Sequence, residues 1–248
     1  MHNELFTLFG LTVHGYGLMI GLGIAASLML SSRRARQRGL SEDTVSTMTI
    51  IAVLTGYLGS KLLYCLVNFD RLLTDPLSVL GSEGWVVYGG ILGGVAGCWL
   101  YCRRKGLDFL AWSDLLLPGV ALAQGLGRVG CFLAGCCYGR ETTSRLGVIF
   151  PPGSLAPAGV RLLPTQLFSA AGDLAICLTL LSMEKRNDFR GRTTAMYLLL
   201  YSAGRFALEF FRGDFRGSVG ALSVSQFISL FVLVWGLCLY RRCGRKAA

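Results

Sequence analysis

TVHGYGLMIGLGIAASLMLSSRRARQR, residues Thr12–Arg38, shows the pattern that decides the fold. The apolar run Thr12–Ser32 is followed directly by a connection that carries four arginines (RRARQR). A mostly apolar run of about 20 residues is long enough to cross a bilayer as a helix. Lysine and arginine collect in the cytoplasmic connections of membrane proteins. We therefore expect a transmembrane helix over Thr12–Ser32 whose C-terminal end faces the cytoplasm.

The same pattern repeats along the chain and predicts an all-α integral membrane protein with about seven transmembrane helices. Basic connections also follow the third, fifth and seventh apolar runs. Because every second connection is basic and the number of runs is odd, we expect the N-terminus outside and the C-terminus in the cytoplasm. The expected spans are 12–32, 44–67, 86–102, 107–126, 162–183, 193–211 and 222–240.

The composition agrees with a membrane protein that sits in a lipid bilayer. Of 248 residues, 53% are hydrophobic and 15% are charged, whereas soluble domains carry about 25% charged residues. The net charge of +10 would suggest nucleic acid as a partner in a soluble protein. Here the basic connections account for most of the charge, so we expect no nucleic-acid partner. Met1–Leu11 is short and nearly neutral, and we expect no cleaved signal peptide.

We expect one integral membrane domain over residues 1–248. The longest outer connection, about 129–161, contains three prolines and a glycine between 151 and 157. Such residues are typical of irregular backbone. This connection is therefore predicted to form a small irregular extracytoplasmic cap rather than a separate domain.

The sequence GLGRVGCFLAGCCYGRE, Gly125–Glu141, is the most informative stretch for function. Arg128 lies at the end of an apolar run, between Gly127 and Gly130. An arginine in hydrocarbon is costly unless it faces a wet, protein-lined cavity or pairs with an anion. The glycines permit close backbone approach and turns. Because a guanidinium group matches phosphate oxygens in a bidentate way, we interpret Arg128 as the residue that holds the phosphate of a lipid.

The nine cysteines and two histidines do not indicate a metal site. The sequence has no C-x-x-C pair, and both histidines lie far along the chain from Cys131, Cys136 and Cys137, so we expect neither a metal nor another cofactor. Three roles stay open for these thiols: small packing residues, a disulfide in an oxidising compartment, or a reactive thiol whose pKa is lowered by nearby arginines.

Several further basic residues lie in the outer half of the predicted topology, where the charge rule does not explain them. Lys61 and Arg205 lie deeper in apolar runs than snorkelling to headgroups readily accounts for. Glu209 follows Arg205 at i+4, and Arg212 lies three residues later, which predicts an Arg–Glu–Arg ladder on one helix face. This ladder is either a structural ion pair that locks two helices or a device in which Glu209 turns Arg205 toward an anion.

Polar side chains near the outer ends of other runs complete the candidate site. Tyr16, in the HGYG motif, is either an interfacial aromatic residue or a ligand of a headgroup. Gln166, in the PTQLF motif, offers an amide to the site. Tyr88 precedes the glycines of the YGGILGG motif, whose bare helix face admits another backbone or an acyl chain.

In one order along nearly the whole chain, the motifs HGYG, YGGILGG, GRVGCF…YG, PTQLF, GRFALEFFRGD and LSVSQ resemble those of the bacterial prolipoprotein diacylglyceryl transferases. The resemblance implies that the diacylglyceryl group of phosphatidylglycerol moves to the thiol of the lipobox cysteine of a prolipoprotein. A thioether forms and glycerol phosphate leaves. It also implies a multi-pass protein of the bacterial plasma membrane, with its active site toward the extracytoplasmic side.

Carried over position by position, the resemblance implies that Arg128 and Arg205 bind the phospholipid. Tyr88 stands where well-studied members have a histidine, and Cys131 where they have an asparagine. A histidine can act as general base for the incoming thiol near neutral pH. A tyrosine, with a reference pKa of about 10, does so only if nearby arginines lower that pKa. Further matches to family positions are Tyr16, Gly139, Glu209 and Arg212.

The sequence thus predicts Arg128, Arg205 and Tyr88 as catalytic residues. Fixed arginines would stabilise the charge that develops on the departing phosphate. Two other functions stay open: a related membrane lipid transferase with a different acceptor, and a non-catalytic lipid-binding or redox membrane protein built around the three clustered cysteines. The residues predicted to bind substrate are Tyr16, Lys61, Gly127, Gly130, Cys131, Gly139, Gln166, Glu209 and Arg212.

Overall fold

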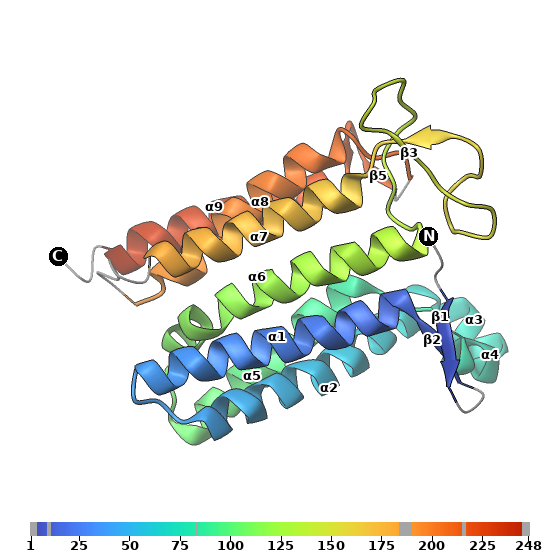
Figure 1. Cartoon of the computed structure of the whole chain (residues 1–248). Coiled ribbons are helices and arrows are strands. Elements are labelled where there is room, and N and C mark those ends of the chain that lie inside the picture. Colours follow the sequence, from blue (N-terminus) through green and yellow to red (C-terminus); the bar gives the residue numbers. More distant parts are fainter. Residues whose placement is uncertain (1–3, 9–10, 83, 184–189, 215–216, 245–248) are drawn as a thin grey trace. The chain divides into compact units, whose positions relative to one another are not determined.

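The computed structural model describes residues 4–8, 11–82, 84–183, 190–214 and 217–244, and these are mainly helical (Figure 1). Within them, a long helix matches each predicted apolar run: α1 Gly15–Gln37, α2 Glu42–Val67, α5 Val87–Lys105, α6 Phe109–Ala134, α7 Thr165–Met183, α8 Arg192–Glu209 and α9 Val224–Gly244. The shorter elements are α3 Phe69–Thr74, α4 Pro76–Gly81, β1 Glu4–Leu8, β2 Leu11–His14, β3 Val148–Ile149, β4 Arg161–Leu162, β5 Ser218–Val219 and β6 Leu222–Ser223.

Five helices in the described part of the chain are long and apolar enough to cross a membrane, namely α1, α2, α6, α7 and α9. The prediction of a mainly helical protein with several membrane-crossing helices is therefore confirmed. Helices α5 and α8 also lie where apolar runs were predicted, but glycines and charges dilute their hydrophobicity. Helix α5 ends on three basic residues, and α8 carries charged residues at both ends.

Helix α6 extends beyond its predicted end at Leu126 and stops at Ala134. The residue that follows, Gly135, has a φ of +74°. The Cys136 N–H donates to the Cys131 carbonyl over 3.1 Å, the six-to-one bond of a Schellman motif. The apolar residues after position 128 continue the helix, and the glycine that can adopt the left-handed conformation ends it.

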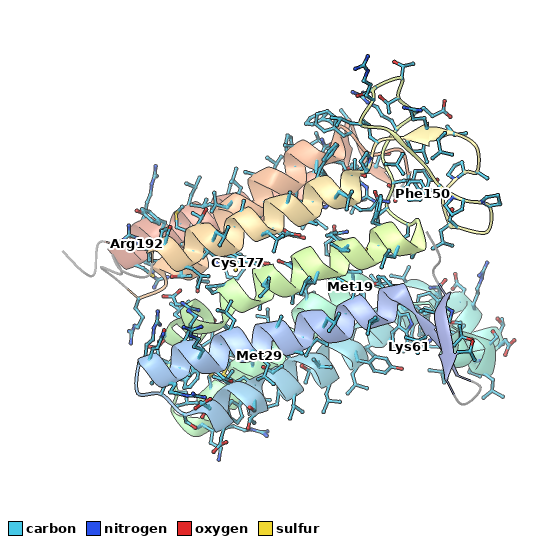
Figure 2. All side chains as sticks on the ribbon, viewed as in Figure 1. Met19, Met29, Lys61, Phe150, Cys177 and Arg192 are labelled. Carbon is cyan, nitrogen blue, oxygen red and sulfur yellow. The ribbon has the colours of Figure 1, made fainter. Side chains whose placement is uncertain are left out.

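This extension places Arg128, Gly127 and Gly130 inside a helix, so the prediction that these glycines make turns was wrong. The other predicted property, close approach, holds for Gly130. A Cβ atom at Gly130 would lie 3.1 Å from the Met19 Cβ and 3.2 Å from the Tyr16 carbonyl oxygen, both in α1 (Figure 2 labels Met19). A Cβ at Gly127 would have no heavy atom within 4 Å.

The chain divides into two compact units, Met1–Ser31 with Ser113–Ala248, and Ser32–Trp112. In the first unit, α6, α7 and α8 share an apolar core, and α8 packs against both α7 and α9 (Figure 1). The side chains of this core are Ala121, Cys177, Leu180 and Tyr197.

A buried carboxylate fixes the start of α8 in the first unit. Asp114 in α6 is 2% exposed. Its Oδ2 accepts from the Gly191 N–H over 2.7 Å, and its Oδ1 accepts from the Thr194 N–H over 2.7 Å. The first N–H groups of a helix have no partner within it and carry partial positive charge. Asp114 therefore satisfies donors at the N-terminus of α8 and ties that end to α6.

The segment between α6 and α7 forms a small body with its own core, made of Phe150, Ala156 and Leu162. Figure 2 shows Phe150 among its loops. Two backbone bonds leave this segment: the Arg140 N–H donates to the Phe211 carbonyl over 2.9 Å, and the Tyr138 carbonyl accepts from the Gly213 N–H over 3.2 Å. These bonds join the segment to the residues that follow α8.

In the second unit, α2 and α5 pack backbone against backbone. A Cβ at Gly56 would lie 3.3 Å from the Gly90 carbonyl oxygen, and one at Gly93 would overlap the Thr55 carbonyl oxygen. Small residues permit such contact between membrane helices. Of the two neighbours expected for the bare face of α5, a second backbone and an acyl chain, the structure shows the backbone of α2.

We predict that Gly93→Ala lowers the stability of the protein. The added methyl group must displace backbone, because the atom it would meet is the Thr55 carbonyl oxygen. Overpacking of this kind costs about 1–3 kcal/mol. Thermal unfolding in detergent measures the effect. The matched control is Gly21→Ala in α1, where a Cβ would have no heavy atom within 4 Å; equal unfolding temperatures for the two variants would contradict the prediction.

Candidate active site

Arg128 in α6 is the centre of a polar group within the first unit. It lies in electrostatic range of Asp173 in α7 and Tyr201 in α8. Among the described residues, no side chain forms a hydrogen bond or a salt bridge with its guanidinium group. Because this group stays charged in a largely apolar helix, it is available to bind an anion.

The sequence left Asp173 without a partner, and the structure supplies Arg128. Asp173 is 4% exposed, and its Oδ2 has no hydrogen-bond partner among the described residues. The two opposite charges are thus close enough to interact but are not joined by a direct salt bridge. The carboxylate reduces the cost of burying Arg128 without occupying its donors.

Helix α8 presents one face to α6 in a regular register. The Tyr197 hydroxyl donates to the Gln124 Oε1 over 2.7 Å, and Tyr201, one turn later, lies in electrostatic range of Arg128. Residues four apart share a helix face. The next turn of that face carries Arg205, about 6 Å further along the axis than Tyr201, because each residue of a helix rises about 1.5 Å. The helical register therefore places Arg205 one turn beyond Tyr201 on the same face of α8.

Arg205 has two direct partners. Its Nη1 forms a salt bridge with Glu209, and its Nη2 donates to the Ser225 Oγ in α9 over 2.7 Å. The predicted Arg205–Glu209 pair is thus confirmed. Both residues belong to α8, so the carboxylate does not itself join two helices. This favours the interpretation in which Glu209 orients Arg205.

The predicted extension of this ladder to Arg212 was wrong. Helix α8 ends at Glu209, so Arg212 does not continue the helical face. Instead its Nε and Nη2 donate to the two carboxylate oxygens of Asp214 over 2.8 and 2.7 Å. The side chain of Arg212 is 3% exposed. Arg212 is therefore held by a bidentate salt bridge outside the helix.

Gly139 lies where three stretches of backbone cross. Its N–H donates to the Leu163 carbonyl over 2.9 Å, and it forms a bridge with Arg212. A Cβ at Gly139 would lie 2.7 Å from the Leu163 carbonyl oxygen and 2.8 Å from that of Phe211. Packing alone therefore requires glycine at this position.

The structure brings together the three thiols that the sequence analysis grouped by their positions along the chain. The Sγ atoms of Cys131, Cys136 and Cys137 lie within 4.8 Å of one another, and none of these residues forms a disulfide. They come from the last turn of α6 and from the loop directly after it. The signal in the sequence is the C-x-x-x-x-C-C spacing across Gly135, whose chain reversal returns the second and third thiols to the first.

Two side chains at the start of α7 hold the loop that carries these thiols. The Thr165 Oγ1 donates to the Cys137 carbonyl over 2.9 Å, and the Gln166 Nε2 donates to the Cys136 carbonyl over 2.7 Å. Both side chains are 1% exposed, and the Gln166 Oε1 has no hydrogen-bond partner among the described residues. Gln166 was predicted to offer its amide to a substrate, and here its amide positions the thiol loop.

The pKa of the Cys136 thiol is raised above its ordinary value. A hydrogen bond with Cys131 is the largest cause, followed by a hydrogen bond with Cys137 and by burial. A reactive thiol activated by arginine would need a lowered pKa. The raised pKa of Cys136 therefore gives this alternative no support at that residue.

Tyr16 in α1 belongs to the same group. It lies in electrostatic range of the three thiols and of Arg128. Its ring reaches toward Gly130, since a Cβ there would lie 3.3 Å from the Tyr16 Cδ2. Close approach of α1 and α6 at Gly130 thus places a phenol beside the thiols.

Lys61 and Tyr88 belong to the second unit. The Lys61 Nζ donates to the Ser82 carbonyl over 2.7 Å and lies 4.9 Å from the ring centroid of Trp85 and 5.2 Å from that of Tyr64. Carbonyl and aromatic groups thus surround this ammonium group (Figure 2 labels Lys61). Tyr88 lies in the first turn of α5 and is half-buried.

A family model and the relatives with similar sequences all point to the same protein family. A family model for prolipoprotein diacylglyceryl transferase matches residues 3–242. Phosphatidylglycerol–prolipoprotein diacylglyceryl transferase 2 of Clostridium perfringens is 49% identical over 244 residues, which cover 96% of this chain and 95% of the relative. The transferase of Clostridium tetani is 45% identical over 242 residues, 97% of each chain, and that of Finegoldia magna is 32% identical over 243 residues, 96% of this chain and 94% of the relative. This chain therefore belongs to the prolipoprotein diacylglyceryl transferase family.

Proposed function

We propose that this protein transfers the diacylglyceryl group of phosphatidylglycerol to the thiol of the lipobox cysteine of a prolipoprotein, the first step of lipoprotein maturation. The match to the family over residues 3–242 carries this conclusion, and the curated relatives named above bear the names of both substrates. The matched region includes every residue predicted to act on the phospholipid.

In the proposed mechanism, Arg128 and Arg205 bind the phosphate and stabilise the charge that develops as it leaves. The phosphodiester has one negative charge, and the departing glycerol phosphate gains a second one. Preorganised donors accelerate a reaction when they bind the transition state more strongly than the substrate. Arg128 contributes donors that have no hydrogen-bond acceptor among the described residues, and Glu209 and Ser225 fix the fork of Arg205.

Asp173 has a supporting role in this mechanism. It lies in electrostatic range of Arg128 without a direct salt bridge. Before substrate binds, the carboxylate lowers the cost of a cation among apolar helices. When phosphate binds, the donors of Arg128 are still accessible. Tyr88, Lys61 and Tyr16 stay predictions from the sequence as residues that contact the headgroup or the acceptor thiol.

We further propose that residues 1–248 form one integral membrane domain with seven spans in a bacterial plasma membrane, including α5 and α8. The last turns of α1, α5 and α9 carry arginines or lysines, and α8 begins at Arg192. Cationic ends of this kind mark the cytoplasmic side. The cap, about 129–161, then lies outside, and the ends of α6 and α8 that carry Arg128 and Arg205 face the extracytoplasmic leaflet.

Reporter fusions test this topology. Green fluorescent protein joined after Ala248 is expected to fluoresce, and alkaline phosphatase at the same place is expected to be inactive, because the positive-inside rule puts that end in the cytoplasm. Alkaline phosphatase inserted after Ser144 in the cap is expected to be active. The reverse pattern at either place would refute the proposed orientation.

Purified protein in detergent, with phosphatidylglycerol and a lipobox peptide, is expected to yield the thioether peptide and glycerol phosphate. A peptide with serine in place of the cysteine is the control for the acceptor. Arg128→Ala is expected to lower kcat/KM about 100- to 1000-fold, the cost of removing a donor that stabilises charge in the transition state. Arg145→Ala, an exposed arginine of the cap, is the matched control, and full activity of the Arg128 variant would refute the assignment.

Glu209→Gln is expected to lower kcat by up to about 100-fold, the cost of a misplaced reacting group, with little change in KM or unfolding temperature. The reason is that Arg205 would keep its bond to Ser225 but lose the partner that directs its fork. Glu42→Gln is the matched control, because it weakens the exposed salt bridge of Arg36, which lies outside the candidate site. A loss of stability with kcat unchanged would show instead that Glu209 is structural.

A further inference from the structure

Three thiols that converge next to Arg128 are unexplained by phosphate binding. The Sγ atoms of Cys131, Cys136 and Cys137 lie within 4.8 Å of one another. Zinc binds thiolate sulfur at about 2.3 Å in tetrahedral geometry, which places any two sulfurs about 3.8 Å apart. The cluster therefore needs to contract by only about 1 Å to surround such an ion.

We propose that Cys131, Cys136 and Cys137 bind one Zn²⁺ ion whose fourth position is open to the thiol of the acceptor peptide. The proposal rests on the proposed function, because the acceptor in that reaction is a cysteine. It replaces the sequence-based expectation of no metal. Three protein ligands with one open position are the arrangement of catalytic zinc, whereas structural zinc has four protein ligands.

The donor set favours zinc over the hard cations. All three ligands are sulfur, which suits soft or borderline ions and not magnesium or calcium. Copper(I) also accepts three thiolates, but it would leave no tetrahedral position for a substrate. Zinc has no redox chemistry, so it can hold a thiolate without oxidising it.

The surroundings of the cluster suit a charged metal centre. Three thiolates and Zn²⁺ carry a net charge of −1, and a fourth thiolate makes it −2. Arg128 lies in electrostatic range of Cys131 and Cys137 and can offset this charge. Side chains of Thr165 and Gln166 hold the carbonyls of the loop at 2.9 and 2.7 Å, and such outer contacts orient metal ligands.

The zinc centre would make the acceptor thiol nucleophilic. When the acceptor sulfur binds zinc, its proton passes to water, because a thiol coordinated to zinc is deprotonated. The sulfur then donates an electron pair to the terminal glycerol carbon of the diacylglyceryl group and forms the C–S bond. The C–O bond to phosphate breaks, and its electron pair leaves with glycerol phosphate beside Arg128. No oxidant or reductant is consumed.

The proposed zinc ion would also explain how the acceptor thiol is deprotonated in this protein. At neutral pH a cysteine thiol, with a reference pKa of about 8.5, is mostly protonated, and the thiolate is the nucleophile. Tyr88 occupies the place of the histidine that could take this proton. A metal that binds the thiol directly supplies the thiolate without a general base.

Metal analysis of the whole purified protein tests the site. Reduced protein titrated with Zn²⁺ in detergent is expected to retain one zinc per chain after gel filtration. Cys131→Ser is expected to lower the affinity by more than the roughly 10- to 100-fold that changes outside the ligand sphere cost. Cys238→Ser, an exposed cysteine in α9, is the control and is expected to bind zinc normally. Retention of less than one zinc, preference for copper(I), or a disulfide within the cluster under the same conditions would overturn the proposal.

Cobalt(II) in place of zinc tests whether the acceptor binds the metal. The sulfur-to-cobalt absorption of the loaded protein is expected to change when the lipobox peptide is added, and not when its cysteine is replaced by serine. Thioether formation at full rate by protein stripped of metal would overturn the zinc proposal and leave the transferase intact. A spectral response to the cysteine peptide without any thioether product would instead uphold the metal site and refute the proposed function.

Discussion

A guanidinium group that cannot lose its proton, set in a helix of a membrane protein, needs a negative charge beside it, and the group around Arg128 follows from this need. Asp173 supplies part of that charge from α7 but forms no direct salt bridge. A closed pair would satisfy the arginine and leave nothing for a ligand. An interaction at longer range offsets part of the cost of burying the guanidinium group and leaves its donors unoccupied, as the proposed binding of phosphate requires.

The positive charge of Arg205 is compensated by direct partners, unlike that of Arg128. Its salt bridge with Glu209 lies within one helix, and Ser225 supplies a further contact from α9. The pair therefore needs only the helical spacing of α8, and the contact with Ser225 holds the guanidinium group of Arg205 from α9. Asp114 adds to this order, because it anchors the first turn of α8 to α6. The register that places Tyr201 near Arg128 thus depends on a buried carboxylate at the other end of the helix.

The sequence predicted the positions of the long helices because apolar length is a local property of the chain. It also predicted the Arg205–Glu209 pair, which depends only on helical spacing. It missed the end of α6, since Gly127, Gly130 and Gly135 look alike in the sequence and only the last adopts a left-handed conformation. The partner of Asp173 could not be predicted, because it depends on how α6 and α7 pack. Gly139 matched a family position, but the sequence could not reveal that neighbouring backbone leaves no room for a side chain.

The predicted departures from the family pattern both concern how the acceptor thiol loses its proton. By the resemblance read from the sequence, Tyr88 stands where well-studied members have a histidine, and Cys131 stands where they have an asparagine. Loss of the base alone would leave a protonated, weakly nucleophilic thiol opposite a good phosphate site. Three sulfurs held within 4.8 Å by the chain reversal at Gly135 would, with the proposed zinc ion, make that thiol anionic without a base. Under the zinc proposal, both departures serve one requirement, a thiolate at the carbon whose phosphate Arg128 is proposed to bind.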